Sequence, residues 1–267
     1  MQVGSAAVEG YTVAMDLGIR GKTAVVTGAS TGIGRAIAES LAAEGVRVML
    51  SARTEATLDR AVEEIRLQGG EAYGHPADVT DPDAILDLIR AARRRFGDPD
   101  ILVANAGGPP PGVPSTLDEA DWRRGFELTL LSAVRLAHAV LPTMRANRWG
   151  RIVNVTSLSV REPIPTLTLS NAFRAGVTGF ARTLATEVAV DGVTVNNVAP
   201  GYTATARVEE VVSTPEAKQK LIQDIPARRF AEPAEIAAVT TFLASQQAAY
   251  ITGQTILADG GLVGSLL

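Results

Sequence analysis

The chain has 267 residues, and 46% of them are hydrophobic, which suits one α/β domain with a sizeable core. Its net charge is −4 and it has no lysine-rich block, which argues against nucleic acid or an anionic membrane as a partner. It has no cysteine and only two histidines, His75 and His138, far apart in the sequence. We therefore expect no disulfide, no metal site and no Ser-His-Asp triad.

Residues 1–17 carry mostly small and polar side chains, and we expect them to form a loosely ordered extension. Residues 1–11 have neither a basic residue nor a long apolar core, so they do not have the pattern of a signal peptide. No apolar run in the chain reaches membrane-spanning length. The sequence therefore predicts a cytoplasmic protein whose folded domain covers residues 18–267.

The first motif is a glycine turn at residues 27–34, between an apolar run and an alanine-rich segment. A strand, a glycine turn and a helix in this order present free backbone N–H groups at the helix N-terminus, where phosphate binds well. Glycines let the backbone approach the phosphate closely. The turn predicts dinucleotide binding by Gly28, Ser30, Thr31, Gly32, Ile33 and Gly34.

Strand and helix patterns alternate along the rest of the chain. Strands are expected over 22–26, 46–51, 72–75, 101–104, 151–155, 194–198 and 254–257, and helices over 34–44, 55–68, 82–96, 119–145, 169–190 and 233–243. This alternation predicts an α/β fold, a doubly wound seven-stranded parallel sheet with helices on both faces. Residues 202–229 are expected to form a lid that, with the proline-rich segment 109–115, roofs a cleft.

In such sheets ligands bind beyond the carboxyl ends of the strands, where the winding reverses. Six features follow the predicted strands and belong on that one edge. They are the glycine turn, Arg53, Asp78, the segment Asn105-Ala106-Gly107, Ser157 and Pro200-Gly201.

Over residues 19–263 these motifs together resemble the short-chain dehydrogenase/reductase family. The matching pieces are Thr27-Gly28 with Gly32-Ile33-Gly34, Asp78-Val79, Asn105-Ala106-Gly107, residues 152–157, Val195-Asn196 with Pro200-Gly201, and residues 251–254 with 259–261. The tail from Phe230 to Gly261 looks most similar to β-ketoacyl-acyl-carrier-protein reductase-like members. The resemblance implies a single-domain Rossmann fold, hydride transfer between a nicotinamide and a carbonyl or alcohol substrate, and a homo-oligomer, either a tetramer or a dimer.

The resemblance also assigns residues to the cofactor. It implies that Asp78, followed by Val79, contacts adenine and that Asn105, Ala106 and Gly107 line the cofactor cleft. It implies further that Pro200, Gly201, Thr203 and Thr205 hold the nicotinamide end. Three simpler interpretations stay open: Asp78 as a loop cap before Thr80, Asn105 as support for the sheet, and Pro200-Gly201 as a chain reversal.

The nucleotide preference depends on the residue that follows the second strand. An acidic residue there, about 20 positions beyond the glycines, would bind the ribose 2′-hydroxyl and select NAD. This chain has Arg53 instead, whose planar fork can pair with a 2′-phosphate. We therefore expect NADP(H) to be favoured over NAD(H). Thr31 stands where many NADP-binding members have a second basic residue, and Arg53 as a solvated surface charge stays open.

The family's catalytic centre has a serine, a tyrosine about thirteen residues later and a lysine four beyond it. Here Ser157 fits the serine, but Ser170 and Arg174 stand at the tyrosine and lysine positions, and Thr129 falls where the family has a helix asparagine. Residues four apart share a helix face, so Ser170 and Arg174 should both face the cleft. Arg174 could hold ribose hydroxyls or stabilise an oxyanion.

This exchange changes the expected acid chemistry. A serine hydroxyl is a far weaker acid than a tyrosine, and an arginine does not exchange its proton near neutrality. Tyr202 is a candidate replacement donor, with lid packing as the simpler interpretation. For Ser157 the simpler interpretation is a cap at a strand end, and for Ser170 and Arg174 it is support of cofactor binding alone.

The sequence thus predicts an NADP-preferring oxidoreductase with an altered proton donor. The alternative is a nucleotide-binding protein with little or no turnover, acting as a sensor or oligomer partner. A third hypothesis is a lyase or isomerase without net hydride transfer. The charged lid residues, Arg207 among them, are expected to be solvated.

Overall fold

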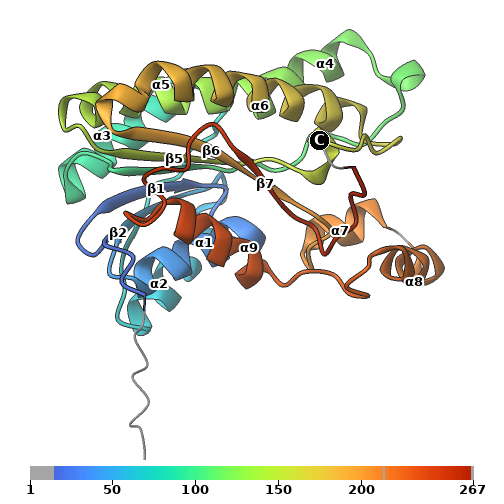
Figure 1. Ribbon diagram of the computed structural model, residues 1–267, viewed down its shortest axis with the longest axis horizontal. Coiled ribbons are helices and arrows are strands. Elements are labelled where there is room, and N and C mark those ends of the chain that lie inside the picture. Colours follow the sequence, from blue (N-terminus) through green and yellow to red (C-terminus); the bar gives the residue numbers. More distant parts are fainter. Residues whose placement is uncertain (1–14, 213, 266–267) are drawn as a thin grey trace, which may run out of the picture.

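The computed structural model describes residues 15–212 and 214–265, so most of the predicted N-terminal extension lies outside the described residues. Seven parallel strands form one sheet in the order β3-β2-β1-β4-β5-β6-β7 (Figure 1). The strands are β1 Thr23–Thr27, β2 Arg47–Ser51, β3 Glu71–Gly74, β4 Ile101–Ala104, β5 Gly150–Val155, β6 Val193–Pro200 and β7 Thr255–Ala258. The predicted doubly wound fold is confirmed, and its winding reverses between β1 and β4.

Helices cover both faces of the sheet (Figure 1). One face carries α3 Pro82–Phe96, α5 Ser132–Ala146 and α6 Thr168–Val188, and the other carries α1 Gly32–Ala43, α2 Glu55–Leu67 and α9 Pro233–Leu243. Along β1, Val25 packs into the first layer while Ala24 and Val26 pack into the second. Strands buried on both sides need continuous apolar runs, which is the pattern that predicted them.

The start of α3 follows the local sequence signal closely. Asp81 is the N-cap residue, its carboxylate accepts a hydrogen bond from the Asp83 backbone N–H at 2.9 Å, and Pro82 is the first helical residue. A capping acceptor and a first-turn proline both satisfy the unpaired N–H groups of a helix start. The position at which α3 begins is therefore determined by local residues.

The predicted single helix over 119–145 is wrong in one respect. It consists of α4 Glu119–Gly125, a π-helical turn η2 Phe126–Leu131, and α5. The Oγ of Ser132, the first residue of α5, donates back to the carbonyl of Leu128 in this turn at 2.6 Å, the kind of side-chain bond that distorts helices. Because the turn contains ordinary helix-forming residues, periodicity alone did not reveal it. The turn contains Thr129, whose side chain is buried.

The predicted lid contains two helices, α7 Ala206–Val211 and α8 Pro215–Asp224. It is fastened to the body by a bridge between Thr203 and Ala231 and by Tyr202 packing on Phe230, with ring centroids 6.1 Å apart. The remaining elements are three 3₁₀ turns, η1 Pro114–Thr116, η3 Leu158–Val160 and η4 Ala189–Asp191.

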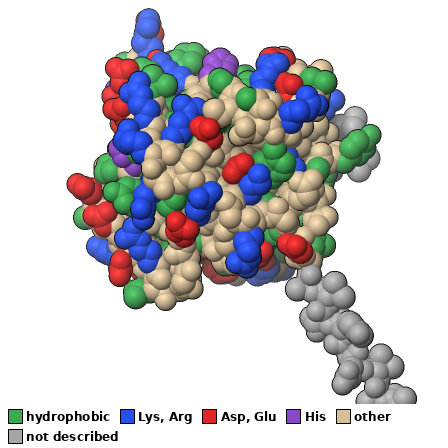
Figure 2. Space-filling view, turned by 90° about the vertical axis from the view of Figure 1, so that its left-hand side faces the viewer, with side chains coloured by type: hydrophobic (Ala, Val, Ile, Leu, Met, Phe, Trp, Pro, Cys, Tyr) green, Lys and Arg blue, Asp and Glu red, His purple; other side chains and the backbone are tan. Residues whose placement is uncertain are grey.

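The surface shown in Figure 2 has Lys and Arg side chains interspersed with Asp and Glu, with no patch of one sign. Among the described residues no helix is both long and apolar enough to span a membrane. Nor does this part of the chain bring three or more metal-ligating His, Asp or Glu side chains together.

Candidate active site

A cleft of about 850 Å³ runs along the carboxyl edge of the sheet. The loops that follow β1, β2, β4, β5 and β6 all contribute to it, as the strand order requires. The sequence-predicted residues that line it are Gly28, Thr31, Gly32, Ile33, Gly34, Arg53, Asn105, Ala106, Gly107, Ser157, Ser170, Arg174, Pro200, Gly201, Tyr202, Thr203 and Thr205. The prediction that these distant segments meet at one edge is confirmed for five of the six features.

The glycine turn is built for close backbone approach. Gly28 and Gly32 adopt φ values of 59° and 58°, a region that side chains disfavour. A Cβ on Gly34 would overlap the Gly28 carbonyl oxygen and lie 2.5 Å from Asn105 Nδ2. Helix α1 starts at Gly32, two residues before the predicted start, and its N-cap Thr31 makes no side-chain cap bond. The first-turn N–H groups of α1 therefore remain available to an anion.

Asn105 joins β4 to the glycine turn. Its Nδ2 donates to the carbonyls of Thr27 and Gly28, each at 3.2 Å, and the Thr27 hydroxyl donates to the Asn105 carbonyl at 2.8 Å. The side chain is thus used to hold the turn in shape, which is the simpler role left open by the sequence. Its position beside the cleft is the expected one.

Two arginines lie at the glycine end of the cleft. Arg53 is exposed and lines the cleft after β2, without an ion pair to any described residue. Arg35, which directly follows Gly34, also lines the cleft but was missed by the sequence analysis. Its Nε donates to Glu39 at 2.7 Å and its fork also pairs with Glu64. The hydrogen bond that Arg35 donates to Glu39 raises the pKa of Arg35 above its ordinary value.

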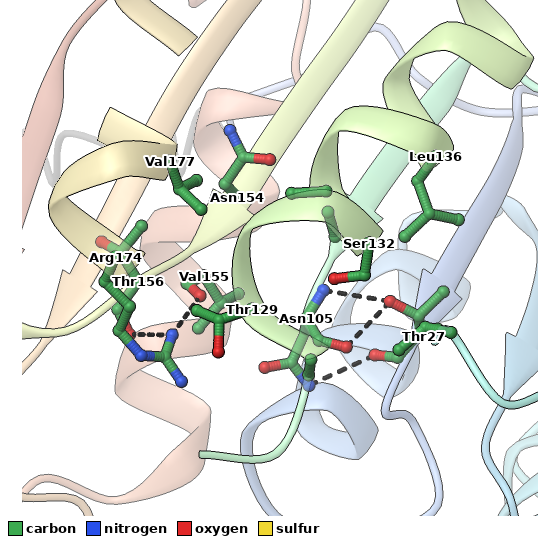
Figure 3. A pocket seen from close by; sticks show the side chains of 14 residues that line it. Thr27, Asn105, Thr129, Ser132, Leu136, Asn154, Val155, Thr156, Arg174 and Val177 are labelled. Atoms are coloured by element: carbon green, nitrogen blue, oxygen red, sulfur yellow. Dashed lines mark hydrogen bonds between the residues drawn. The ribbon is translucent and has the colours of Figure 1, made fainter. Parts of the chain in front are cut away.

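Ser170 and Arg174 lie together on α6, as the spacing predicted. Arg174 Nε donates to Ser170 Oγ at 3.2 Å, and its Nη1 donates to the carbonyls of Val155 and Thr156, each at 2.8 Å (Figure 3). Burial, and secondly the charge of Arg207, lower the pKa of Arg174 to about 10. The guanidinium thus stays charged at neutral pH, held against the end of β5.

Ser157 is the second residue after β5. Its Oγ accepts a hydrogen bond from the Ser159 backbone N–H at 3.1 Å, so the hydroxyl caps the η3 turn. The hydroxyl proton remains free to donate, because the cap uses only a lone pair. Ser157 therefore serves as a strand-end cap and still borders the cleft.

A second, small cavity of about 20 Å³ lies behind Arg174 (Figure 3). Thr129, Asn154 and Arg174 line it, together with Val79. Thr129 Oγ1 and Asn154 Oδ1 are both buried without a hydrogen-bond partner among the described residues. A space of this size with two unsatisfied acceptors has room for one water molecule.

The loop after β6 closes the other side of the cleft. Gly201 approaches Asp259 so closely that a Cβ would lie 2.6 Å from its Cα, and Thr203 Oγ1 donates to the Gly201 carbonyl at 3.2 Å. Thr205 Cγ2 would be 3.3 Å from a Cβ on Gly32, so the lid reaches across to the glycine turn. Burial, and secondly Glu162, raise the pKa of Tyr202 above its ordinary value.

Four predicted residues, Ser30, Asp78, Val79 and Thr129, lie away from the cleft lining. The Asp78 carboxylate is exposed and accepts hydrogen bonds from the Thr80 N–H at 2.9 Å and the Thr80 hydroxyl at 2.8 Å, which is the loop-cap role left open above. Val79 and Thr129 line the small cavity behind Arg174 instead, and Ser30 lines neither space among the described residues.

The Arg207 side chain is still 35% exposed, but it makes contacts that the prediction of a solvated charge did not include. Its Nη2 donates to the Pro109 carbonyl at 2.8 Å and its Nη1 pairs with Glu210 at 2.9 Å, so the side chain lies over the cleft. Gly108 makes room for it, because a Cβ there would be 2.8 Å from Arg207 Nη2. The missed signal was its position in the first turn of a helix directly after the predicted cofactor loop.

The comparisons agree with this geometry. A family model described as enoyl-(acyl carrier protein) reductase matches residues 28–263. The 3-oxoacyl-(acyl-carrier-protein) reductase FabG of Haemophilus influenzae is 40% identical over 245 residues, which cover 91% of this chain and 99% of that protein. The chain belongs to the short-chain dehydrogenase/reductase family.

Members of this family that resemble the chain act on unlike molecules. The 7alpha-hydroxysteroid dehydrogenase of Escherichia coli is 34% identical, over 94% of this chain and 98% of that protein. The crystal structure of L-sorbose reductase from Gluconobacter frateurii, complexed with NADPH and L-sorbose, has a TM-score of 0.89 at 34% identity, over 94% of this chain and 100% of that chain. Family membership therefore leaves the substrate open.

Proposed function

We propose that this chain is an NADP(H)-preferring oxidoreductase that transfers hydride between the nicotinamide and a carbonyl or alcohol substrate, with a proton donor different from the family's. The single observation that carries the proposal is that the Ser170–Arg174 pair and the glycine turn border the same cleft. The similarity to 3-oxoacyl-(acyl-carrier-protein) reductases supports it.

The cleft fits a dinucleotide in the features that matter for binding. Gly34 leaves the room that a side chain would fill, and the first turn of α1 has N–H groups for the pyrophosphate. Asn105, Ala106 and Gly107 would flank the cofactor, and Pro200, Gly201, Thr203 and Thr205 would hold its nicotinamide end. When bound, the nicotinamide would supply or accept a hydride. Asp78 as an adenine contact remains a prediction.

The preference for NADP(H) is inferred from Arg53. It lines the cleft without an ion pair to the described residues, and its fork can bind a 2′-phosphate bidentately. Arg35 adds a second positive charge to the cleft lining, although Glu39 and Glu64 form ion pairs with it. The NADPH complex of L-sorbose reductase and that of an actinorhodin polyketide ketoreductase, 34% identical to this chain, support the same nucleotide.

Ser170 is the proposed proton donor. Its Oγ accepts from Arg174 Nε, so its own proton is free to reach a carbonyl oxygen in the cleft. The Arg174 charge would stabilise the negative oxygen as it forms. Tyr202 is the weaker candidate because its pKa is raised rather than lowered. Ser157 would orient the substrate carbonyl. Thr129, which lines the small cavity together with Arg174, would help to position the Arg174 side chain.

The same pair also supports the second candidate, a nucleotide-binding protein with little or no turnover. Loss of an effective general acid typically costs about 10²- to 10⁴-fold in rate. Binding would survive this loss, since the glycine turn is intact. A homo-oligomer, either a tetramer or a dimer, and a cytoplasmic location remain predictions.

The test is a fluorescence titration with NADPH and NADH, followed by turnover measurements on a panel of ketones and aldehydes. Arg53→Glu should weaken NADPH binding by about tenfold or more, the value of one lost charge-assisted pair. Arg60→Glu, on the exposed side of α2, is the matched control and should bind NADPH as the native protein does.

The catalytic part is tested by the double variant Ser170→Tyr with Arg174→Lys. Faster ketone reduction than the native chain would support an altered donor on an otherwise competent site. Tight NADPH binding with no turnover in either protein would favour the second candidate. Absence of binding of both nucleotides at millimolar concentration would refute both.

A further inference from the structure

The cleft is positively charged in a chain whose net charge is −4. Its charged lining residues among the described part of the chain are Arg35, Arg53, Arg174 and Arg207 against Glu39 and Glu210. Arg35 and Arg53 belong to the glycine end, where the proposed cofactor has its phosphates. Two further arginines also line the cleft: Arg174 lies beside Ser170 on α6, and Arg207 lies on the lid above Gly108.

Arg174 carries a charge that the protein does not balance. Its Nε and Nη1 donate to a hydroxyl and to two main-chain carbonyls, all of which are uncharged. No carboxylate of the described residues forms an ion pair with it, and its Nη2 makes no hydrogen bond to them. Charges removed from water without a partner are costly, so such a group favours an incoming anion.

Arg207 approaches the same space from the lid. It is held by the Pro109 carbonyl on one side and by Glu210 on the other, which fixes its guanidinium over Gly108. It is near enough for its charge to lower the pKa of Arg174. Glu210 pairs with Arg207, so Arg174 is the charge left without a carboxylate, and an anion between the two guanidinium groups would balance it.

The surroundings limit the size and character of that anion. Leu158, Ile164 and Leu167 line the same side as Ser157 and Ser170, so apolar walls stand beside two hydroxyls. A carbonyl would accept from the hydroxyls, a short apolar chain would contact the leucines, and a carboxylate would accept from the unused Nη2 of Arg174.

We infer that the substrate of this protein is a small oxo acid, whose carboxylate is held between Arg174 and Arg207 while its carbonyl meets Ser170. This inference rests on the proposed function. The overall reaction stays balanced: the oxo acid, NADPH and one proton give the hydroxy acid and NADP⁺.

The competing explanation is that both arginines serve only the cofactor, at its ribose or pyrophosphate. The two explanations predict different changes in anion affinity and in NADPH affinity when an arginine is replaced. If an arginine holds the substrate carboxylate, its loss weakens anion binding and leaves NADPH affinity nearly unchanged. If it holds the cofactor, NADPH affinity falls as well.

The experiment is calorimetric titration of oxamate and of its neutral analogue oxamide, with NADPH-saturated and with nucleotide-free protein. Oxamate has a carboxylate beside an amide carbonyl and cannot be reduced by hydride, so the readout is binding alone. We expect oxamate to bind at least tenfold more tightly than oxamide. Arg207→Gln should remove about tenfold of the oxamate affinity, and Arg207→Lys should restore part of it.

Arg161→Gln is the matched control, because Arg161 is exposed just beyond the cleft lining and should leave oxamate binding unchanged. Equal affinity for oxamate and oxamide in the NADPH complex overturns the carboxylate inference and leaves the proposed function standing. Parallel loss of NADPH and oxamate affinity in Arg207→Gln overturns it too. If NADPH does not bind, the proposed function fails, and the oxamate–oxamide difference in nucleotide-free protein decides the inference separately.

Discussion

Two arginines, Arg151 on β5 and Arg174 on α6, bind main-chain carbonyls at opposite ends of β5 but have different surroundings. Arg151 is the second residue of β5. Its Nε donates to the Ser245 carbonyl at 3.0 Å, and its Nη1 donates to the Gly150 carbonyl at 2.9 Å. Arg174 donates to the two carbonyls that end the strand. Burial is the first cause that lowers the pKa of each guanidinium to about 10.

The difference is the space in front of them. Arg151 is only 1% exposed, and its guanidinium lies 4.4 Å from the ring centroid of Trp149. Arg174 borders a cleft of about 850 Å³ and faces a second arginine. Arginines bound to main-chain carbonyls can therefore be structural or functional. The room left for an anion distinguishes them.

The largest expected effect is the loss of stability when Arg151, the structural arginine of the two, is replaced. Arg151→Met removes the donors of three carbonyls, including that of Gly192, and should lower the free energy of unfolding by about 2–4 kcal/mol. Urea unfolding followed by circular dichroism measures it. NADPH affinity of the folded variant should stay within about twofold of the native value, since distant sites are nearly independent.

Arg174→Met is the counterpart. It removes an unbalanced charge, so its unfolding free energy should change by less than about 1 kcal/mol while oxamate binding is lost. Equal destabilisation by both substitutions would contradict the distinction between the two ends of the strand.

The second prediction concerns the carboxyl edge itself. Gly34→Ala brings a Cβ onto the Gly28 carbonyl and Asn105 Nδ2, both parts of the fixed turn. Forced overpacking of this kind costs about 1–3 kcal/mol, so NADPH affinity should fall by about 10- to 100-fold. Fluorescence titration gives the ratio of dissociation constants. Gly179→Ala on α6, where a Cβ meets nothing within 4 Å, should bind NADPH normally.

The contrast between the strand ends also explains what the sequence could predict. Apolar runs, glycine turns and the Asp81-Pro82 helix start are local signals, and each produced its element within a few residues. Their alternation fixed the sheet edge at which Gly34, Ser157 and Arg174 would meet. The spacing of Ser170 and Arg174 was sufficient to place them on one helix face.

The features that the sequence did not reveal depend on tertiary contacts. Arg207 was expected in solvent because its helix is polar, but the Pro109 carbonyl and the missing side chain of Gly108 hold it over the cleft. The π turn that carries Thr129 has no sequence period of its own. Arg151 gave no sign of burial, since only the packed Trp149 and Ser245 create its site.

The third prediction tests the cavity behind Arg174. We expect one ordered water there, bound to Thr129 Oγ1 and Asn154 Oδ1, because both atoms otherwise lack partners. Thr129→Val should displace it and lower the unfolding free energy by about 0.5–1.5 kcal/mol. High-resolution crystal structures of both proteins check the water directly. An empty cavity in the native protein would contradict this prediction.

The smallest expected effect uses an arginine whose charge is balanced, in contrast to Arg174. Arg229 pairs with Glu235 through both Nη atoms, at 2.6 and 2.7 Å, on the surface beside the lid. The hydrogen bond from Arg229, followed by that from the Glu232 backbone N–H, lowers the pKa of Glu235 from 4.5 to about 2. A lowered carboxyl pKa means that the pair contributes stability above pH 4.5 and loses it as the pH falls toward 2.

The measurement is the difference in unfolding free energy between the native protein and Glu235→Gln, followed by urea unfolding at several pH values. The difference should be constant above pH 5 and shrink as the pH falls below 4.5, and Arg229→Gln should show the same dependence. Glu216→Gln on α8 is the control, because its carboxylate forms no ion pair with the described residues. Salt should weaken the Glu235 effect, since exposed pairs are screened. A difference that grows on acidification would contradict the assigned direction, whereas salt-sensitive loss would mark Arg229 as a balanced surface charge, unlike the arginine that faces the cleft.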